Sequence, residues 1–323
     1  MYSGDNFLQS SIFAQIKSPS WKALYLIDEA SEIKLLILTR IVPFLGTVAY
    51  IPGGPNIPSV ESFHKLATSI KLFLKIHHPD IFLIKFEPRI AGAKQSDFLK
   101  NGLVQAPSIQ PNATIVLPVT TDLTQMGRRA RRYIRTGERE GVTVKNVKLS
   151  EKNMHTMYNL MGSAYGGRGI PGLRTFAYYK KFWSLFHEAN AGDLYFAYDN
   201  NTPVAGVFVV KNGKIALYKD GGSLHGRQSK GATYLIHWKI MQDLAADKYT
   251  FYDLWGSPPS SQIGAPAHPL AGLASFKTAF STVVTDYPGV FDSIVNQRKY
   301  CLWQLAYPLL RRFLLMVKKE GFY

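Results

Sequence analysis

Short apolar runs separated by turn-forming residues dominate the first part of the chain. They span residues 21–28, 33–42 and 47–52. Each run is rich in the β-branched and aromatic residues that favour strands. Residues 60–77 then place apolar side chains near helical spacing, and the apolar run 80–86 follows. The pattern therefore predicts strand hairpins, then a helix, then another strand.

The same order of elements returns in the second half of the chain. Its apolar runs lie at residues 192–199, 203–211 and 214–220, its helical stretch at 230–246 and its last run at 249–255. The dipeptide Asn212-Gly213 between two runs is a hairpin signal, because both residues tolerate positive φ. An offset of roughly 170 positions between the copies indicates an internal repeat. We therefore expect an α/β chain of the α+β type, with two similar lobes and mixed sheets.

A polar, arginine-rich segment lies between the two copies. The pattern predicts a helix from near Thr121 to Gly141, with Asp122 or Thr124 as its N-cap. We place the lobe boundary just after this helix, so that residues 1–145 form the first lobe and residues 146–295 the second. The second lobe contains no long heptad-patterned charged segment, so we expect no coiled-coil insertion.

The last segment, residues 296–323, reads as an apolar helix studded with cations. Pro308, Arg311 and Arg312 interrupt it, which makes it a poor membrane span. We expect it to pack back on the first lobe. A peripheral contact with the anionic inner face of a membrane, through Arg311, Arg312, Lys318 and Lys319, is the second possibility.

Composition adds a prediction about the partner. The 323 residues include 38 Lys and Arg against 22 Asp and Glu, a formal net charge of +16, which favours encounters with RNA, phosphate esters or anionic lipid surfaces. The single cysteine, Cys301, excludes a disulfide within the chain and favours a cytoplasmic address. We expect Cys301 to pack in the core. The N-terminus lacks the pattern of a secretory signal peptide.

Six separated segments form a recognisable set of motifs: FLQSSIFAQIK at 7–17, YIPGGP at 50–55, KFEP at 85–88, MGRRARRYIRTGEREGVTV at 126–144, FYDLWG at 251–256 and GLASFKTAF at 272–280. In this order they resemble the FemABX family, whose members have two acetyltransferase-like (GNAT-type) lobes and build the interpeptide bridges of peptidoglycan. Phe13 stands where the family commonly has Trp, and Glu87 where it usually has Asp. The chain is most similar to the shorter, FemX-like members.

This resemblance implies an aminoacyltransferase with two tandem GNAT-like lobes. Such an enzyme transfers an amino acid from aminoacyl-tRNA to the stem-peptide amine of a peptidoglycan precursor, which is either lipid II or a UDP-MurNAc-pentapeptide. We expect a cytoplasmic monomer without a bound cofactor. No histidine or cysteine spacing indicates a metal site. The donated amino acid and its position in the bridge stay open.

The resemblance also assigns candidate site residues. Lys277 matches a family lysine beside the reacting ester, and a positioned ammonium there would stabilise the oxyanion; a solvated surface lysine is the alternative. The other candidates are substrate-binding residues: Lys17, Glu87, Arg132, Arg135, Tyr252, Asp253, Trp255 and Phe276. For the arginines, substrate phosphate, RNA and plain solvation are equal alternatives. Strand alternation favours a core position for Trp255 and a polar contact for Asp253.

Two other functions remain open at this stage. An acyl-CoA-dependent N-acyltransferase would use the same lobes, and HGRQSKGAT at 225–233 faintly echoes the pyrophosphate-binding loop of acetyltransferases. A basic protein that binds RNA or membrane without catalysis is the other alternative. The arginine-rich helix favours RNA over CoA, and Lys277 favours catalysis.

Overall fold

The computed structural model describes residues 6–28, 33–99, 102–165, 173–224, 230–317 and 321–323. Its chain divides into two compact units, one formed by Met1–Asn112 with Asp286–Tyr323 and the other by Ala113–Thr285. Both contain helices packed on a mixed six-stranded sheet. Within the described residues, no helix is both long and apolar enough to cross a membrane.

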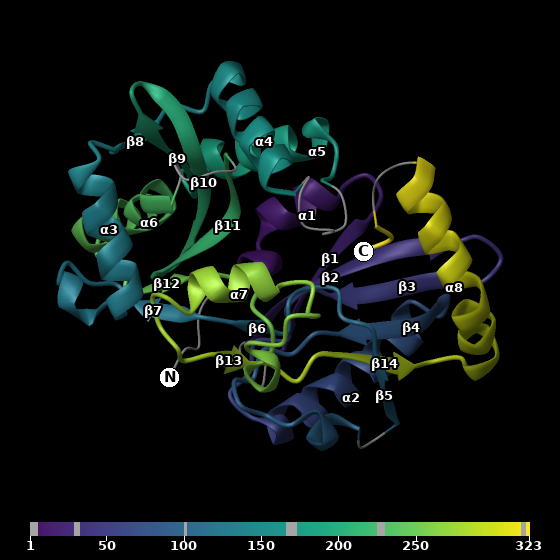
Figure 1. Ribbon diagram of the computed structural model, residues 1–323. Helices are drawn as coiled ribbons and strands as arrows, with labels where there is room; N and C mark the ends of the chain where they lie inside the picture. The colour runs from purple at the N-terminus through teal and green to yellow at the C-terminus, as the bar shows by residue number, and fades with distance from the viewer. Residues whose placement is uncertain (1–5, 29–32, 100–101, 166–172, 225–229, 318–320) are drawn as a thin grey trace. The chain divides into compact units, whose positions relative to one another are not determined.

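The first unit is built on the sheet β1-β2-β3-β4-β14-β5 (Figure 1). Its strands are β1 (Lys22–Asp28), β2 (Ile33–Val42), β3 (Gly46–Ile51), β4 (Ile81–Phe86), β5 (Leu103–Ala106) and β14 (Val290–Ile294). Its helices are α1 (Ser11–Lys17), α2 (Val60–His77) and α8 (Gln297–Val317), with short 3-10 turns η1 (Phe7–Gln9) and η2 (Gln95–Phe98). Strands β3 and β4 run parallel and the other pairs antiparallel.

Strand β4 presents apolar side chains to both faces of the first sheet, because Phe82 lies at a register shift between β3 and β4 that interrupts the usual alternation. Phe86 contacts Phe63 of α2 on one face, with ring centroids 5.5 Å apart. Phe82 contacts Trp303 of α8, at 6.1 Å, and Lys85 lies over the ring of Tyr323. Helix α2 therefore packs on one face, and α8 belongs to the first unit.

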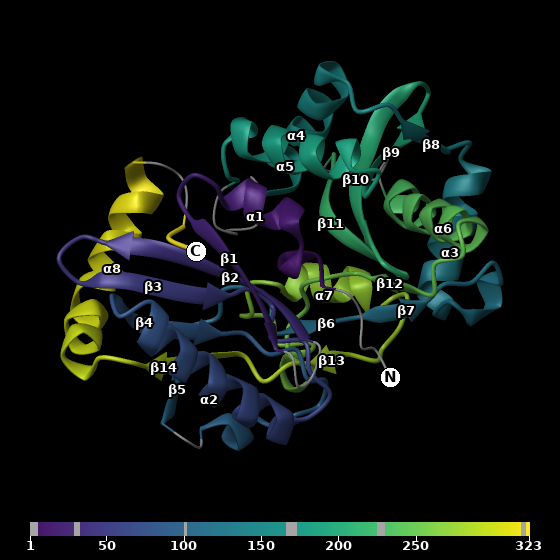
Figure 2. The ribbon, with the colours of Figure 1, turned by 180° about the vertical axis from the view of Figure 1, so that it is seen from behind.

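The second unit is built on the sheet β7-β12-β11-β10-β9-β8, seen from the opposite side in Figure 2. Its strands are β7 (Val116–Pro118), β8 (Thr143–Val147), β9 (Gly192–Asp199), β10 (Thr202–Asn212), β11 (Ile215–Ser223) and β12 (Phe251–Asp253). Its helices are α3 (Arg128–Arg139), α4 (Glu151–Tyr165), α5 (Phe176–Glu188), α6 (Lys230–Ala246) and α7 (Ala271–Lys277), with 3-10 turns η3 (Leu123–Gln125) and η5 (Ser260–Gln262). The short strands β6 (Ala113–Thr114) and β13 (Thr285–Asp286) pair where the chain enters and leaves this unit.

The predicted repeat is present. In each unit, three successive antiparallel strands are followed by a helix and then by a fourth strand that pairs parallel to the third. These elements are β1-β2-β3-α2-β4 in the first unit and β9-β10-β11-α6-β12 in the second. The predicted hairpin joins β10 to β11, and Gly213 in its loop has φ +56.

The predicted boundary after Lys145 and the predicted start of the basic helix both differ from the structure. Asp122 caps the 3-10 turn η3, and α3 begins only at Arg128. Helix α3 packs on α6 within the second unit, where Gly137 and Gly231 approach so closely that a Cβ on Gly231 would lie 2.7 Å from the Cα of Gly137. This close packing places α3 in the core of the second unit, which begins at Ala113.

Two further expectations concern the end of the chain. β14 lies between β4 and β5 in the first sheet, whereas the sequence pattern places residues up to 295 in the second lobe. Cys301 is exposed on α8, so the expectation that it packs in the core was wrong. Its sulfur accepts a long contact of 3.7 Å from the amide of Gln297, one turn earlier on the same helix.

Candidate functional site

Lys277 lies at the C-terminal end of α7 and is almost completely buried, with 4% of its surface exposed. Its ammonium donates hydrogen bonds to the backbone carbonyls of Trp255 and Gly256, the latter at 2.6 Å. It also lies over the ring of Tyr218, 5.5 Å from the centroid. The alternative of a solvated surface lysine does not describe this side chain.

Burial lowers the pKa of Lys277 to about 7, although the negative charge of Asp253 acts in the opposite direction. The cause is desolvation, since a buried ammonium loses its water shell and gains only neutral carbonyl partners. Near neutral pH the amine and ammonium forms are both populated. Such a perturbed amine beside a cleft is typical of functional sites.

The loop after β12 holds the carbonyls that Lys277 contacts. Asp253 is 1% exposed and accepts a hydrogen bond from the backbone N–H of Trp255 at 2.7 Å and another from the hydroxyl of Thr114. Trp255 and Gly256 both have positive φ, at 50° and 49°. Trp255 therefore lies beyond the strand in a half-buried turn, which corrects its expected core position. Asp253 fixes this turn, which aims two carbonyls at one amine.

A pocket of about 320 Å³ lies beside Lys277 within the second unit. His237, Tyr218 and Phe276 line it; the ring of His237 is 4.5 Å from that of Tyr218 and 5.4 Å from that of Phe276. Behind it, the hydroxyl of Tyr252 lies 2.8 Å from Nδ1 of His237. Of the residues predicted from the sequence, Phe276 lines this pocket, whereas Lys277 and Tyr252 each contact a residue that lines it, Tyr218 and His237 respectively.

Burial sets the protonation of the groups around this pocket. Desolvation, aided by the positive charge of Lys277, lowers the pKa of His237 to about 3. Burial also raises the pKa of Tyr252 well above its usual value. Both side chains are neutral at physiological pH, so among these groups Lys277 is the one that titrates near neutrality.

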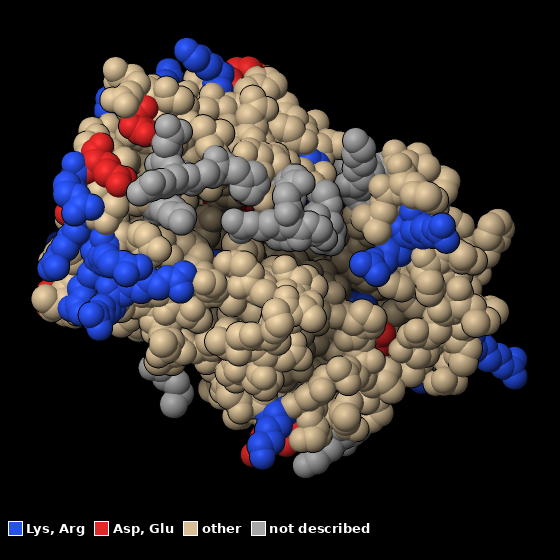
Figure 3. All heavy atoms as spheres, in the orientation of Figure 1, with Lys and Arg blue, Asp and Glu red and all other residues tan. Residues whose placement is uncertain are grey.

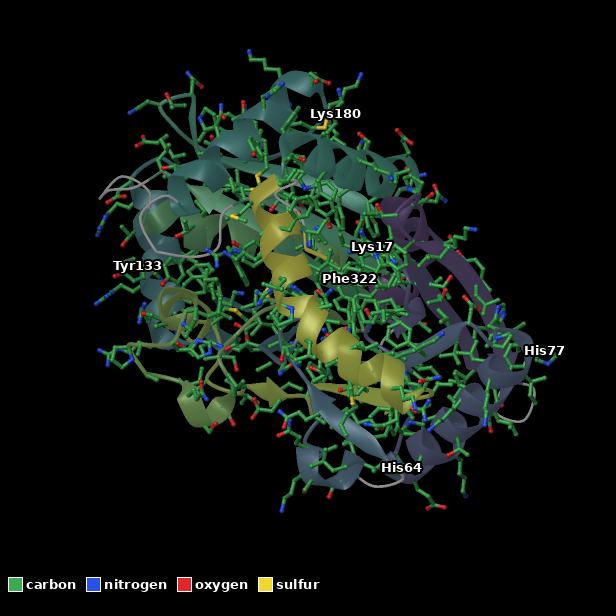
Figure 4. The ribbon with its side chains drawn as sticks, turned by 90° about the vertical axis from the view of Figure 1, so that its right-hand side faces the viewer. Lys17, His64, His77, Tyr133, Lys180 and Phe322 are labelled. Atoms are coloured by element: carbon green, nitrogen blue, oxygen red, sulfur yellow. The ribbon has the colours of Figure 1, made fainter. Side chains whose placement is uncertain are left out.

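A second hollow, of about 830 Å³, lies along α3. Six arginines line it: Arg128, Arg129, Arg131, Arg132, Arg135 and Arg139. Figure 3 shows this dense group of Lys and Arg atoms over α3. Arg132 and Arg135 are exposed, and Arg132 lies over the ring of Tyr133, which is labelled in Figure 4. Convergent guanidinium groups are suited to phosphate oxygens.

Arg129 connects the arginine hollow to the Lys277 pocket, because it lines both. It donates a hydrogen bond of 2.9 Å to the hydroxyl of Ser275 on α7. Tyr133 and Tyr234 stack beside it with ring centroids 4.7 Å apart, and both line the smaller pocket. A polyanion along α3 would therefore have a terminal group within reach of the pocket.

Glu87 lies in the first unit and has internal partners for both carboxylate oxygens. It accepts hydrogen bonds from the hydroxyl of Tyr50 at 2.7 Å, from Gly53 N–H at 3.0 Å and from Gln110 N–H at 2.9 Å. Only 3% of its surface is exposed. The geometry makes Glu87 a residue that fixes the turn after β3.

Lys17, also in the first unit, is the last residue of α1 (Figure 4). It is partly exposed, and its ammonium lies over the ring of Phe13, 5.4 Å from the centroid. Phe13 is buried. A cation at this position is accessible to an anionic ligand, whereas Phe13 has a packing role.

Sequence reasoning missed His237, Arg129, Tyr133 and Tyr234. His237 is a polar residue inside the apolar helical stretch YLIHWKI, a pattern that signals a buried polar group. Ala130 and Ile134, one turn apart in the arginine run, are buried and mark the inner face of α3. Arg129 and Tyr133, each one position earlier, flank that face.

Two other predictions concern loops and ligands. The segment HGRQSKGAT falls largely on residues 225–229, outside the described residues. Among the residues that the structure does describe, no three His, Cys, Asp or Glu side chains are grouped to hold a metal ion.

Part of the second unit is similar to a known domain family. Residues 125–262 match the family model of the acetyltransferase (GNAT) domain. The match lies within the second unit, which also contains the Lys277 pocket. No curated protein matches the sequence.

The whole chain is similar to a more particular structure, the crystal structure of FemX. The two are 20% identical, the match covers 94% of each chain, and the TM-score is 0.76. Two more distant folds are the C-terminal domain (DUF2156) of a putative lysylphosphatidylglycerol synthetase from Agrobacterium fabrum, at 14% identity, 95% and 92% coverage and TM-score 0.53, and L-PGS from Bacillus licheniformis, at 12% identity, 89% and 88% coverage and TM-score 0.51. The predicted FemX-like fold is confirmed.

Proposed function

We propose that this chain transfers an amino acid from aminoacyl-tRNA to the stem-peptide amine of a peptidoglycan precursor. The observation that carries the proposal is the buried ammonium of Lys277, held by two carbonyls beside a pocket in a GNAT domain. The FemX-like fold supports the acceptor class, and the arginine hollow supports an RNA donor.

The reaction exchanges an ester for an amide. The neutral acceptor amine attacks the ester carbonyl of the aminoacyl group, and a tetrahedral oxyanion forms. Its collapse breaks the bond to the ribose oxygen, which leaves with a proton from the attacking amine, so the products are an amide and free tRNA. Because an ester is more reactive than an amide, alignment and oxyanion stabilisation suffice, and no protein nucleophile is required.

Lys277 would supply the oxyanion stabilisation. An ammonium has three N–H donors, and the carbonyls of Trp255 and Gly256 take two of them. We assign the third to the substrate oxyanion. The desolvated surroundings strengthen this interaction relative to water, because the local dielectric is low.

Arg132 and Arg135 would contact phosphates of the tRNA, with the tRNA end directed past Arg129 to the Lys277 pocket. Lys17 would contact the diphosphate of the precursor. We assign Glu87 to positioning the turn at Gly53, since its carboxylate accepts three internal hydrogen bonds.

An acyl-CoA-dependent N-acyltransferase is the second candidate function. The observation that favours it is the match of residues 125–262 to the acetyltransferase (GNAT) model. It predicts transfer from acyl-CoA, with release of a free thiol, that does not depend on RNA.

Transfer of radiolabelled amino acids from a charged total-tRNA pool to lipid-linked and nucleotide-linked muropeptides tests the proposal. We expect RNase-sensitive transfer by the wild type and a loss of ~10²–10³-fold in kcat for Lys277→Met, the range for removal of one oxyanion donor. Lys239→Met is the matched control, because that lysine is 42% exposed and paired with Asp243.

Three outcomes would overturn the proposal. The first is an absence of transfer from every tRNA pool by protein that is folded. The second is RNase-insensitive transfer from acyl-CoA, which would establish the second candidate. The third is full activity of Lys277→Met, which would remove the role of the lysine.

A further inference from the structure

Helix α8 is apolar on two opposite faces. One face packs within the first unit: Trp303 lies 5.1 Å from Phe322 and 6.1 Å from Phe82, measured between ring centroids. Tyr300 and Leu314 are also buried on this face. Figure 4 shows Phe322 beside this helix. The expected packing of the C-terminal helix accounts for this face alone.

The second face of α8 carries a stripe of large apolar side chains that are open to solvent. They are Leu302 (55% exposed), Leu305 (75%), Leu309 (73%), Phe313 (54%) and Met316 (65%). Steps of three or four positions place these side chains along one line of a helix. Single exposed apolar residues are ordinary, but a continuous stripe of this kind marks an interaction surface.

The charges on α8 indicate the kind of partner. The 21-residue helix contains Arg298, Lys299, Arg311 and Arg312 and no Asp or Glu. Figure 3 shows a group of Lys and Arg atoms over α8. A second copy of the chain would bring these cations against one another, whereas an anionic surface would complement them. Helical spacing places Lys299 and Arg312 on either side of the stripe, and an apolar stripe flanked by cations is the pattern of a helix that lies in the interface of a bilayer.

A hairpin tip extends this surface. The β2–β3 turn approaches the first turn of α8, because a Cβ on Gly46 would lie 3.3 Å from Nζ of Lys299. At its tip Phe44 is fully exposed and has φ +64. A bulky residue in this left-handed conformation is unusual, since Asn or Gly fits it with less strain. Phe44 therefore adds an aromatic side chain that an interface would bury.

We propose that the α8 stripe and Phe44 seat the protein on an anionic lipid bilayer, with α8 lying in the plane of the headgroups. The apolar side chains enter the acyl boundary, and the arginines contact the lipid phosphates. The proposal goes beyond the transfer reaction, and it concerns a surface of the first unit alone.

A fluorophore attached to Cys301 can report contact between α8 and a bilayer. Cys301 is the only cysteine, is exposed, and lies one turn before Leu305 on α8. A thiol-reactive, polarity-sensitive fluorophore on Cys301 should shift to the blue on vesicles of phosphatidylglycerol and phosphatidylcholine. Vesicles of phosphatidylcholine alone should give a smaller shift, and flotation of the unlabelled protein should follow the same order.

Substitutions separate the apolar and charged contributions. Leu305→Gln with Leu309→Gln should lower the partition coefficient at least ~10-fold, because each removes buried apolar area. Arg311→Gln with Arg312→Gln should lower it about fivefold per charge at low salt and less at high salt. Phe44→Asn removes the aromatic ring and suits the positive φ. The matched control is Leu72→Gln with Ile76→Gln on α2, where both side chains are similarly exposed.

The result that overturns the proposal is equal binding by the stripe variants, the α2 control and the wild type, or no vesicle binding at low salt. A concentration-dependent dimer that the stripe variants abolish, without vesicle binding, would assign the face to a second copy instead. Vesicle binding is measured without transfer, so it can succeed or fail independently of the proposed reaction.

Discussion

Among the residues that the structure describes, each unit buries one lysine, and the two lysines differ in their partners. Lys85 and Lys277 are each 4% exposed. In the first unit Lys85 forms an ion pair with Asp292, which also accepts a hydrogen bond from Tyr300 at 3.2 Å. In the second unit the partners of Lys277 are backbone carbonyls.

The difference distinguishes a lysine with a carboxylate partner from Lys277, whose amine and ammonium forms are both populated near neutral pH. A carboxylate of opposite charge is the partner of the buried ammonium of Lys85. Carbonyl dipoles compensate Lys277 only in part, so its proton is weakly held near neutral pH. The match to the acetyltransferase (GNAT) model, at residues 125–262, lies in the same unit as Lys277.

The largest effect is expected from Lys85→Met. It leaves the carboxylate of Asp292 buried without its cation, and breaking such a pair costs ~3–5 kcal/mol. Urea unfolding would measure this loss, and Lys85→Met combined with Asp292→Leu should recover most of it. The control, Lys65→Met in the exposed Glu61 pair, should leave the free energy of unfolding almost unchanged, because solvent screens this pair. Full stability of Lys85→Met would mean that the two lysines do not differ in this way.

The pH dependence of stability should distinguish the second lysine. Between pH 7 and pH 10.5 the unfolded state holds the Lys277 proton and the folded state releases it. The unfolding free energy of the wild type should therefore rise with pH relative to Lys277→Met, by up to ~1.4 kcal/mol per pH unit. Denaturant titrations across this range would measure the slope. Parallel curves for the two proteins would show that Lys277 titrates like an exposed lysine.

Glu87→Gln is expected to have an intermediate effect. The amide nitrogen would face a donor at Gly53 or at Gln110, so unfolding should become easier by ~1–3 kcal/mol. Glu61→Gln, at an exposed position, is the control. A raised KM for the muropeptide with unchanged stability would instead support the substrate contact that the sequence predicted for Glu87.

The smallest effect on stability is expected from Arg132→Ala with Arg135→Ala, within ~0.5 kcal/mol, because both side chains are exposed. The double variant should bind tRNA more weakly than the wild type. The slope of log affinity against log salt concentration should fall by about one unit per lost phosphate contact. Lys145→Ala with Lys152→Ala changes the charge equally and is the control. If the two double variants bind tRNA equally, the change in net charge explains the effect, and the position of Arg132 and Arg135 does not.

Local pattern predicted most individual elements. The apolar runs at 33–42 and 60–77 coincide with β2 and α2, because alternation and helical spacing are properties of the segment itself. The sheet to which β14 belongs was not predicted. Its pairing with β4 and β5 is a long-range contact that no local pattern specifies.

The candidate site residues come from the resemblance, which does not predict their geometry. The partners of Lys277 are backbone carbonyls, which leave no mark in a side-chain pattern. Trp255 follows a strand that ends at Asp253, so alternation could not place it. Glu87 is satisfied internally because the parallel strands β3 and β4 bring Tyr50 and Gly53 to its carboxylate.

The position of β14 has a consequence for synthesis on the ribosome. This strand lies inside the first sheet, yet it is made after the whole second unit. The second unit is one continuous segment and can fold as soon as it emerges. The first unit must wait with an open gap between β4 and β5, and during that interval its exposed strand edges are open to aggregation or to chaperones. Truncation before Val290 should therefore prevent folding of the first unit, while the second unit still folds.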